Sequence, residues 1–442
     1  MSQPDRSTAS RQLGFWMCTA LVVGNTIGMG IFLLPASLAP YGFNTLFGWA
    51  IPLLGCLALA RTLSCLASAL PHAEGPYGYI RHTLGQLPAF VALWAYWVAA
   101  WLTNAALATG VVGYLVVVFP AATQVNPALL ALGLIWLAVT VNSLGIRSGG
   151  GVQIVTTALK LLPMMAIALL GGWVLISTPD SYVAHPPATP VTMHGVLTAS
   201  TIALYAMLGF ETGSVPAAQV DDPGSTIPRA TMIGTVLLAI TYMIVSTVPL
   251  LLIEQQELAA SSAPFSLLLD RLVGVGAGRW LALFVVISGI GCLNGWTLIV
   301  GELTRTMANN GVMPVLFASN NRFGAPAPAL LVTGVFASIM VGMNYSQALV
   351  AAFTFISLAV TAATLPLYLG CALALIVLWH RGEAIHSACH VLPVALVGIL
   401  FAIFAFVGAG REPFLLALAL GAAGLPLYML MRLRRRSAIP AK

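Results

Sequence analysis

Charged residues are scarce in this sequence, and their scarcity restricts the classes of protein that it can encode. Only 7% of its 442 residues are Asp, Glu, Lys or Arg, whereas 59% are hydrophobic. The mean hydropathy is +0.96. With so few polar side chains, a water-soluble domain could not keep its surface hydrated. The composition therefore excludes an ordinary soluble protein and predicts a chain embedded in a lipid bilayer.

Motifs for catalysis, metals and cofactors are also missing. No segment matches the H-E-x-x-H motif of zinc proteases or the G-x-S-x-G motif of serine hydrolases, and the connections between apolar runs are too short for a catalytic domain. The stretch "HSACH", with His386, Cys389 and His390, lacks the fourth ligand of a zinc site. All six cysteines fall in apolar runs or short loops and imply no disulfide framework. We therefore expect no enzyme, no metal and no cofactor.

Long apolar runs are what the sequence has in abundance. A helix needs about 20 apolar residues to cross a hydrocarbon core of about 30 Å, and runs of this kind recur from one end of the chain to the other. We predict an all-α membrane protein with twelve transmembrane helices, at residues 13–38, 45–69, 88–118, 128–143, 151–176, 195–217, 229–252, 279–300, 327–343, 347–378, 391–409 and 413–431.

The distribution of basic residues between these spans predicts the orientation. One side carries only Arg271, Arg279 and Arg411. The other side is basic and is therefore expected to be cytoplasmic, with both termini on it; its basic residues are Arg6, Arg11, Arg81, Arg147, Arg229, Arg305, Arg322, Arg381, Arg432, Arg434, Arg435, Arg436 and Lys442. The net charge of +6 follows from this topology. The charge therefore gives no reason to expect a nucleic acid partner. We expect the lipid bilayer of the cell inner membrane to surround the protein.

Two predicted spans contain glycine-rich interruptions at matching places. The first span carries "GNTIGMGIF" (24–32), and the sixth, five helices later, carries "YAMLGFETG" (205–213). Breaking a helix in lipid is costly unless the freed backbone groups face a cavity. Transporters built from inverted repeats carry such paired breaks at the substrate site. The alternative is that the glycines only allow helices to pack closely.

The paired breaks predict both an organisation and a ligand. We expect a tail (1–12), two five-helix inverted repeats (13–185 and 186–378), a pair of final helices (379–431) and a basic tail (432–442). Backbone N–H groups freed between Gly28 and Gly30 would favour a carboxylate. Carbonyl groups freed near Leu208 would suit an ammonium. One cavity would then hold both ends of an α-amino acid.

Two charged residues fall in the middle of predicted spans, whereas Arg61 lies near the cytoplasmic end of the second span. Glu211 lies in the core of the sixth span, where a carboxyl group is functional by default. Lys160 lies about ten residues into the fifth span, or about 15 Å of helical rise. An ammonium at this depth can bond carbonyls freed near Gly24 and Asn25. A tilted helix that lets this lysine reach the cytoplasmic face is the alternative.

At these motifs the sequence resembles the amino acid/polyamine/organocation superfamily of transporters, and in particular its arginine/agmatine antiporter branch. The resemblance covers nearly the whole chain, and it rests on "GNTIGMGIFLLPASLA", "WVAAWLTNAALATGVVGYL", "YAMLGFETGSVPA", "VDDPGSTIPRA" and "GWTLIVGELTRTMANNGVMP". It implies the LeuT-type five-plus-five fold with helices 1 and 6 broken, no obligatory sodium, often a homodimer, and exchange or proton-coupled uptake of amino acids or polyamines.

The resemblance also implies a set of site residues. Glu211 matches a proton-sensing carboxylate, and Tyr205 matches a gating aromatic residue. Lys160 is similar to a lysine that some sodium-independent relatives place where LeuT-type folds bind sodium. This likeness implies that Lys160 replaces a coupling cation and holds the first span against the eighth. The substrate-binding residues that it implies, from the carboxylate stretch to the side-chain end of the pocket, are Ile27, Gly28, Met29, Gly30, Ala99, Ala100, Asn104, Tyr205, Leu208, Trp296 and Ser357.

Some positions depart from the antiporter pattern. Met29, Tyr205 and Ala100 stand where that branch has serine, tryptophan and cysteine, and "DDPGST" lacks the usual arginine. A sodium-independent exchanger of cationic amino acids or their amines is therefore the first expectation. Proton-coupled uptake of neutral amino acids is the alternative, and a transport-inactive amino acid sensor is a remote one.

Overall fold

The computed structural model describes residues 15–70, 73, 75–145, 150–182, 184–209, 223–383 and 391–437, and every structural statement below concerns these residues. They form α-helices and short 3-10 turns, with no strand in these ranges. The helices are α1 (Phe15–Thr26), α2 (Gly30–Leu38), α3 (Asn44–Ala69), α4 (Gly75–Leu84), α5 (Gln86–Val118), α6 (Pro127–Ser143), α7 (Gly150–Ser177), α8 (Met193–Met207), α9 (Pro223–Leu252), α10 (Gln255–Ala260), α11 (Pro264–Leu272), α12 (Ala277–Asn309), α13 (Ala327–Met343), α14 (Leu349–Arg381), α15 (Val391–Gly408), α16 (Arg411–Ala422) and α17 (Gly424–Ser437).

The helices include many that are apolar enough to cross a bilayer. Within the described ranges, 8 have both the length and the composition to do so, and five shorter apolar helices accompany them. An apolar chain adopts helices in lipid because a helix satisfies every backbone N–H and C=O within one segment. The predicted all-helical membrane fold is thus confirmed at this level.

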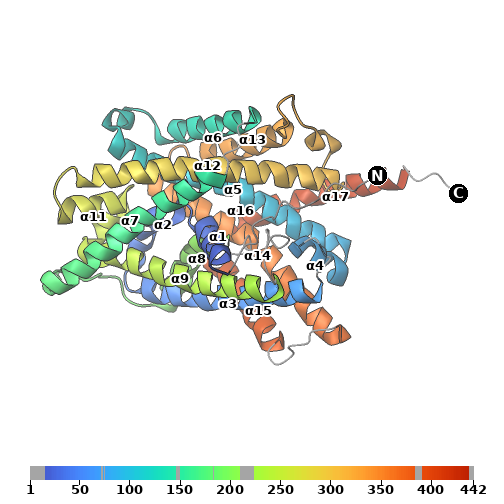
Figure 1. Ribbon diagram of the computed structural model, residues 1–442, viewed down its shortest axis with the longest axis horizontal. Helices are drawn as coiled ribbons and strands as arrows, with labels where there is room; N and C mark the ends of the chain where they lie inside the picture. The colour runs from blue at the N-terminus through green and yellow to red at the C-terminus, as the bar shows by residue number, and fades with distance from the viewer. Residues whose placement is uncertain are drawn as a thin grey trace, which may run out of the picture.

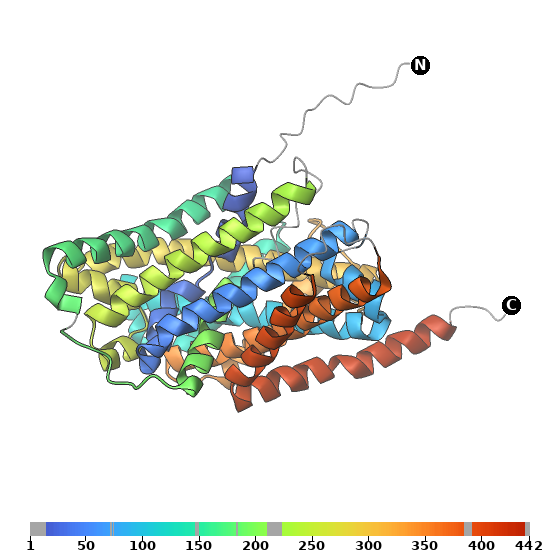
Figure 2. The same ribbon diagram turned by 90° about the horizontal axis from the view of Figure 1, so that it is seen from below.

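Helix α5 runs through the centre of the bundle and packs against α12 and α14 (Figure 1). Of its most apolar stretch, 78% is buried inside the protein, compared with 11% for the stretch Arg411–Leu433 in α16 and α17. The last helices therefore lie at the edge of the molecule, where α17 projects away from the bundle (Figure 2). Residues on α5 are the best placed to line an interior site.

Both predicted interruptions have a counterpart in the described residues. Helix α1 ends at Thr26 and α2 begins at Gly30, which leaves residues 27–29 outside either helix. Helix α8 ends at Met207, after which Leu208 is extended and Gly209 has φ 108°. Side chains with a Cβ rarely adopt that conformation, so a glycine is needed there. The rest of the predicted sixth span, including Glu211, lies outside the described residues, as does "HSACH".

The structure contains helices that the apolar runs did not predict. Helix α4 precedes α5, and α10 and α11 connect α9 to α12. Gln255 on α10 donates hydrogen bonds to the carbonyl of Ala39 and to the hydroxyl of Thr189. The Asn44 amide similarly bonds the carbonyl of Pro190. These contacts join the ends of α2, α3, α8 and α9 at one end of the bundle.

Candidate functional site

The break between α1 and α2 lies directly against the end of α8. A Cβ built on Gly30 would lie 2.9 Å from Cε1 of Tyr205 and 3.6 Å from Cα of Ala206. Only a glycine leaves room for the Tyr205 ring to cover the start of α2. The structure therefore brings together the two glycine motifs that the sequence singled out as a pair.

Unpaired backbone donors line this break. The N–H of Ile27 continues the helical pattern by bonding the carbonyl of Val23, whereas no hydrogen bond from the N–H of Gly28 or Met29 is recorded to a described residue. Met29 also provides no side-chain cap for α2. Donors at a helix start favour an anionic group. The arrangement can accept a carboxylate at residues 28–30.

The Met29 side chain lies between α5 and α12. It packs between two glycines of neighbouring helices, since a Cβ on Gly110 of α5 would lie 3.4 Å from its Cβ and one on Gly289 of α12 would lie 2.6 Å from its Sδ. Met29 is 1% exposed. Only the backbone of Met29 can therefore take part in carboxylate binding, and its thioether fills the core.

Asn104 carries an unsatisfied acceptor in the middle of α5. Its side chain is 3% exposed, and its Oδ1 is buried without a hydrogen-bond partner. A buried amide oxygen without a partner costs roughly 1 to 3 kcal/mol, so a ligand donor would stabilise it. Ala99 and Ala100, one turn earlier on the same helix, are also buried and contribute small apolar surface.

Ser357 and Phe353 occupy one face of α14. The Ser357 hydroxyl donates to the carbonyl of Phe353 at 2.7 Å, so only its lone pairs remain available. The Phe353 ring meets the Tyr205 ring edge to face, with 5.8 Å between centroids. The sequence reasoning selected Ser357 and missed Phe353. Their separation of four residues on one helix was the available signal.

Trp296 and Leu208 complete the predicted set of binding residues. Trp296 on α12 is half-buried and packs against the main hydrophobic core, as Leu208 does beyond the end of α8. Carbonyls in the last turn of a helix lack the usual i+4 partner, and at the end of α8 the carbonyl of Tyr205 accepts from the N–H of Leu208 at 3.3 Å; each such carbonyl has a second lone pair. They can accept hydrogen bonds from an ammonium. Among the described residues no ring contact or hydrogen bond joins Trp296 to Tyr205, so its place at the substrate stays a prediction.

Lys160 is buried in α7, with 3% of its surface exposed. Helix α7 packs against α12 and α9. No hydrogen bond from Lys160 to the carbonyls of Gly24 and Asn25 is recorded among the described residues. Its proposed role in holding the first span against the eighth therefore stays a prediction.

Comparison with known proteins agrees with this geometry. Residues 13–417 match the family model described as "Amino acid permease". The chain is 30% identical over 335 residues to the cadaverine/lysine antiporter of Escherichia coli K12, covering 74% of each protein. It is 27% identical over 427 residues to the putrescine transporter PotE of the same strain, covering 96% of each protein. PotE of Haemophilus influenzae is 26% identical over 426 residues, which cover 96% of this chain and 97% of that one.

The family match extends over most of the chain and includes every described element that forms the candidate site. These relatives carry amines and a cationic amino acid in their names. Both the broken helix and the sequence matches lead to one conclusion: this chain belongs to the amino acid permease family of the amino acid/polyamine/organocation superfamily.

Proposed function

We propose that this protein is a sodium-independent exchanger of cationic amino acids and their amines that works by alternating access. The observation that carries the proposal is the break at residues 27–29, which lies next to Tyr205 at the end of α8. At this break the N–H groups of Gly28 and Met29 have no partner among the described residues. The relatives named as a cadaverine/lysine antiporter and a putrescine transporter support the substrate class. Arginine and agmatine belong to the same chemical class and stay a prediction.

In this proposal each end of an amino acid meets a different helix break. The carboxylate accepts from the N–H groups of Gly28 and Met29, and the α-ammonium donates to the carbonyls at the end of α8. Asn104 accepts a further hydrogen bond with its free Oδ1. A diamine lacks the carboxylate and leaves the first subsite empty, so the amine contacts must suffice for it.

The helix pattern supports twelve spans in two inverted repeats. The eight long apolar helices account for predicted spans 2, 3, 5, 7, 8, 10, 11 and 12. The shorter apolar helices fill the remaining four, with α1 and α2 as the two halves of the first span, α6 as the fourth, α8 as the first half of the sixth and α13 as the ninth. Short half-helices at positions one and six are typical of this architecture.

Hydrogen bonds between helix ends support the proposed alternation of span directions, and the distribution of arginines supports an inner-membrane topology with both termini cytoplasmic. Arg279 at the start of α12 donates to the carbonyl of Val118 at the end of α5. Asn321, before α13, donates to the carbonyl of Ser143 at the end of α6. Alternating span directions require the two ends of each pair to lie on the same side, so these contacts support the predicted alternation. The exposed α16 and α17 leave a face available for the homodimer that the family resemblance implies.

Two charged residues supply coupling in the proposal. Lys160, buried in α7, provides a cation in place of sodium. Glu211 lies outside the described residues and would sense protons, as the resemblance implies. Proton-coupled uptake of neutral amino acids remains the alternative, because Ala99 and Ala100 are buried and apolar. A sensor without transport activity is the remote one.

Exchange across reconstituted vesicles tests the proposal. Proteoliposomes preloaded with lysine should take up labelled cadaverine, whereas empty vesicles should not, and choline in place of sodium should change nothing. Uptake of labelled leucine driven by an inward proton gradient would favour the alternative. Absence of any amine or amino acid flux from protein that still binds substrate would favour the sensor.

A further inference from the structure

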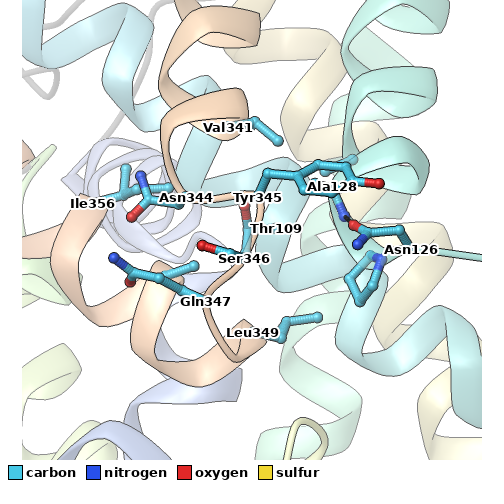
Figure 3. A pocket seen from close by; sticks show the side chains of 13 residues that line it. Thr109, Asn126, Ala128, Val341, Asn344, Tyr345, Ser346, Gln347, Leu349 and Ile356 are labelled. Carbon is cyan, nitrogen blue, oxygen red and sulfur yellow. Dashed lines mark hydrogen bonds between the residues drawn. The ribbon is translucent and has the colours of Figure 1, made fainter.

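A cavity of ≈ 260 Å³ lies between the ends of α5, α6, α13 and α14, apart from the Tyr205–Gly30 contact. We call it the α6–α14 cavity; it is lined by Thr109, Asn126, Pro127, Ala128, Ala131, Val341, Asn344, Tyr345, Ser346, Gln347, Leu349, Ala352 and Ile356. Figure 3 shows polar side chains converging on it from the start of α6 and from the connection between α13 and α14. One water occupies about 30 Å³ of liquid, so the cavity has room for a small organic ligand.

The two deeply buried polar side chains of the cavity present acceptor oxygens. Thr109 is 7% exposed, and it uses its only hydroxyl hydrogen in a bond to the carbonyl of Ala105 at 2.8 Å. Asn344 is 5% exposed, and its Nδ2 donates to the carbonyl of Met340. No described group donates to the Oδ1 of Asn344. The interior of the cavity therefore favours a ligand that brings hydrogen-bond donors.

The mouth of the cavity is polar and carries no charge. Tyr345, Ser346 and Gln347 are exposed there, and none of the lining residues is acidic or basic. Asn126 uses its side-chain oxygen to cap α6 by accepting from the N–H of Ala128. A ring of uncharged oxygens can replace the hydration shell of a small cation, as carbonyl groups do in ion channels. Because none of the lining residues is basic, a ligand that carried a carboxylate would find no oppositely charged side chain in the cavity.

The cavity also adjoins the central site along two helices. On α5, Thr109 of the cavity is followed by Gly110, which packs against Met29. On α14, Ala352 and Ile356 of the cavity are followed by Phe353 and Ser357. The Phe353 ring then meets Tyr205. A ligand in the α6–α14 cavity would thus touch faces of α5 and α14 that lie about 100° around each helix from the faces that border the central site.

We propose that the α6–α14 cavity is a second binding site, for a primary alkylammonium group, distinct from the central site at the helix breaks. Thr109 Oγ1 and Asn344 Oδ1 accept hydrogen bonds from the ammonium, and polar side chains at the mouth replace part of its hydration shell. Ala128, Leu349 and Ile356 contact the alkyl chain. The site goes beyond the proposed transport function, and it does not depend on that function being correct.

A local reporter tests this site without any transport measurement. A Ser346→Cys, Cys389→Ser variant is labelled with a trifluoromethyl thiol reagent and followed by fluorine NMR; the described native cysteines are buried. Titration with n-butylammonium should shift the resonance saturably, and n-butanol and butyrate at equal concentration should not. Adding Thr109→Val should raise the apparent Kd by about tenfold or more, because one charge-assisted hydrogen bond is lost. Thr109→Ser, which keeps the hydroxyl, should restore binding.

Charge substitutions at the exposed mouth give the sign of the ligand. Gln347→Glu should tighten n-butylammonium binding several-fold, and Gln347→Lys should weaken it. Gln256→Glu and Gln256→Lys, at an exposed position of α10 outside the cavity, are the matched controls and should change little. Trp296→Leu, in the proposed central site, should leave this titration unchanged.

Four results would overturn the proposal. The first is a fluorine resonance shift with n-butanol equal to that with n-butylammonium, and the second is an apparent Kd that Thr109→Val leaves unchanged. The third is tighter n-butylammonium binding in Gln347→Lys and weaker binding in Gln347→Glu. The fourth is loss of the saturable shift in Trp296→Leu. The last would assign the signal to the central site. Failure of lysine and cadaverine exchange with this titration intact would overturn the transport proposal alone.

Discussion

At the scale of single residues, two glycines two positions apart have different packing. A Cβ on Gly30 would lie 2.9 Å from the Tyr205 ring, whereas one on Gly28 would meet only the side chain of Leu107, at 3.7 Å. The first distance is too short for real atoms and the second is ordinary contact. Gly30 is therefore required for the approach of α8 to the break, whereas the packing around Gly28 has space for a methyl group.

These glycines give a matched pair of substitutions. We expect Gly30→Ala to displace Tyr205 and weaken binding of labelled lysine at least tenfold, while Gly28→Ala changes it less than threefold. Equilibrium binding to purified protein measures both. Gly30→Ala combined with Tyr205→Leu should recover part of the loss, because the smaller side chain leaves room for the methyl group. Equal effects of the two single substitutions would contradict the packing argument.

Trp296 and Tyr205 provide the aromatic surface near the proposed substrate site. If the ammonium of a cationic substrate lies over Trp296, Trp296→Leu should cost about 0.5 to 2 kcal/mol of binding free energy, or roughly two- to thirtyfold in affinity. Trp296→Phe keeps a ring and should lose less. Unchanged affinity for lysine and cadaverine in both Trp296→Leu and Tyr205→Leu would remove these residues from the site.

At the scale of helices, Tyr114 joins three elements at the end of the bundle near α2. Its buried hydroxyl donates to the carbonyl of Phe32 on α2 at 2.7 Å and accepts from the N–H of Phe265 on α11 at 3.4 Å. The rings of Phe32 and Phe265 pack edge to face, 5.8 Å apart. Helices α2, α5 and α11 are thereby held together on one side of the helix break.

Tyr114→Phe keeps the ring and removes both hydrogen bonds. We expect the free energy of unfolding to fall by about 1 kcal/mol or somewhat more, since a buried carbonyl and a buried N–H lose their partner. Helix α2 should also become more accessible to thiol reagents at a cysteine introduced at Leu38. Tyr428→Phe is the control, because its hydroxyl takes part in no hydrogen bond recorded among the described residues. Identical thermal stability of both variants would refute this role.

At the scale of the whole molecule, arginine placement relative to the bundle is the strongest evidence for orientation. Arg322 and Arg411 are both exposed, and they fall on opposite sides in the proposed topology. In a Cys389→Ser background, we expect Arg322→Cys to react only with permeant thiol reagents in intact cells. Arg411→Cys should react with impermeant ones. The reverse labelling pattern would overturn the orientation and the assignment of the two repeats.

A second prediction for the whole molecule concerns Lys160, the buried cation of α7. If Lys160 replaces a coupling cation, transport by Lys160→Ala and Lys160→Gln should collapse while the proteins stay folded and stable in detergent. Transport by the unmodified protein should not respond when sodium is exchanged for choline. Retained exchange in both variants, or a strict sodium requirement, would exclude this role. Leu161→Ala, one residue further along α7, is the control for simple disturbance of the helix.

Several features could be predicted from the sequence because they depend on local chemistry. The scarcity of charge determines that the chain lies in a membrane, and the length of each apolar run determines a helix. Gly28, Gly30 and Gly209 mark the ends of α1, α2 and α8, because glycine tolerates the backbone of a break. These properties need no knowledge of which helices are neighbours.

The tertiary structure alone decided which surfaces meet. Helix α5 is apolar on every side, so its periodicity cannot indicate which face is directed to a site and which to a neighbour. For that reason the sequence did not reveal that Met29 fills a gap between Gly110 and Gly289, or that Phe353 contacts Tyr205. The α6–α14 cavity likewise exists only because two pairs of consecutive helices, α5 with α6 and α13 with α14, leave space where the pairs converge although they are far apart in the chain.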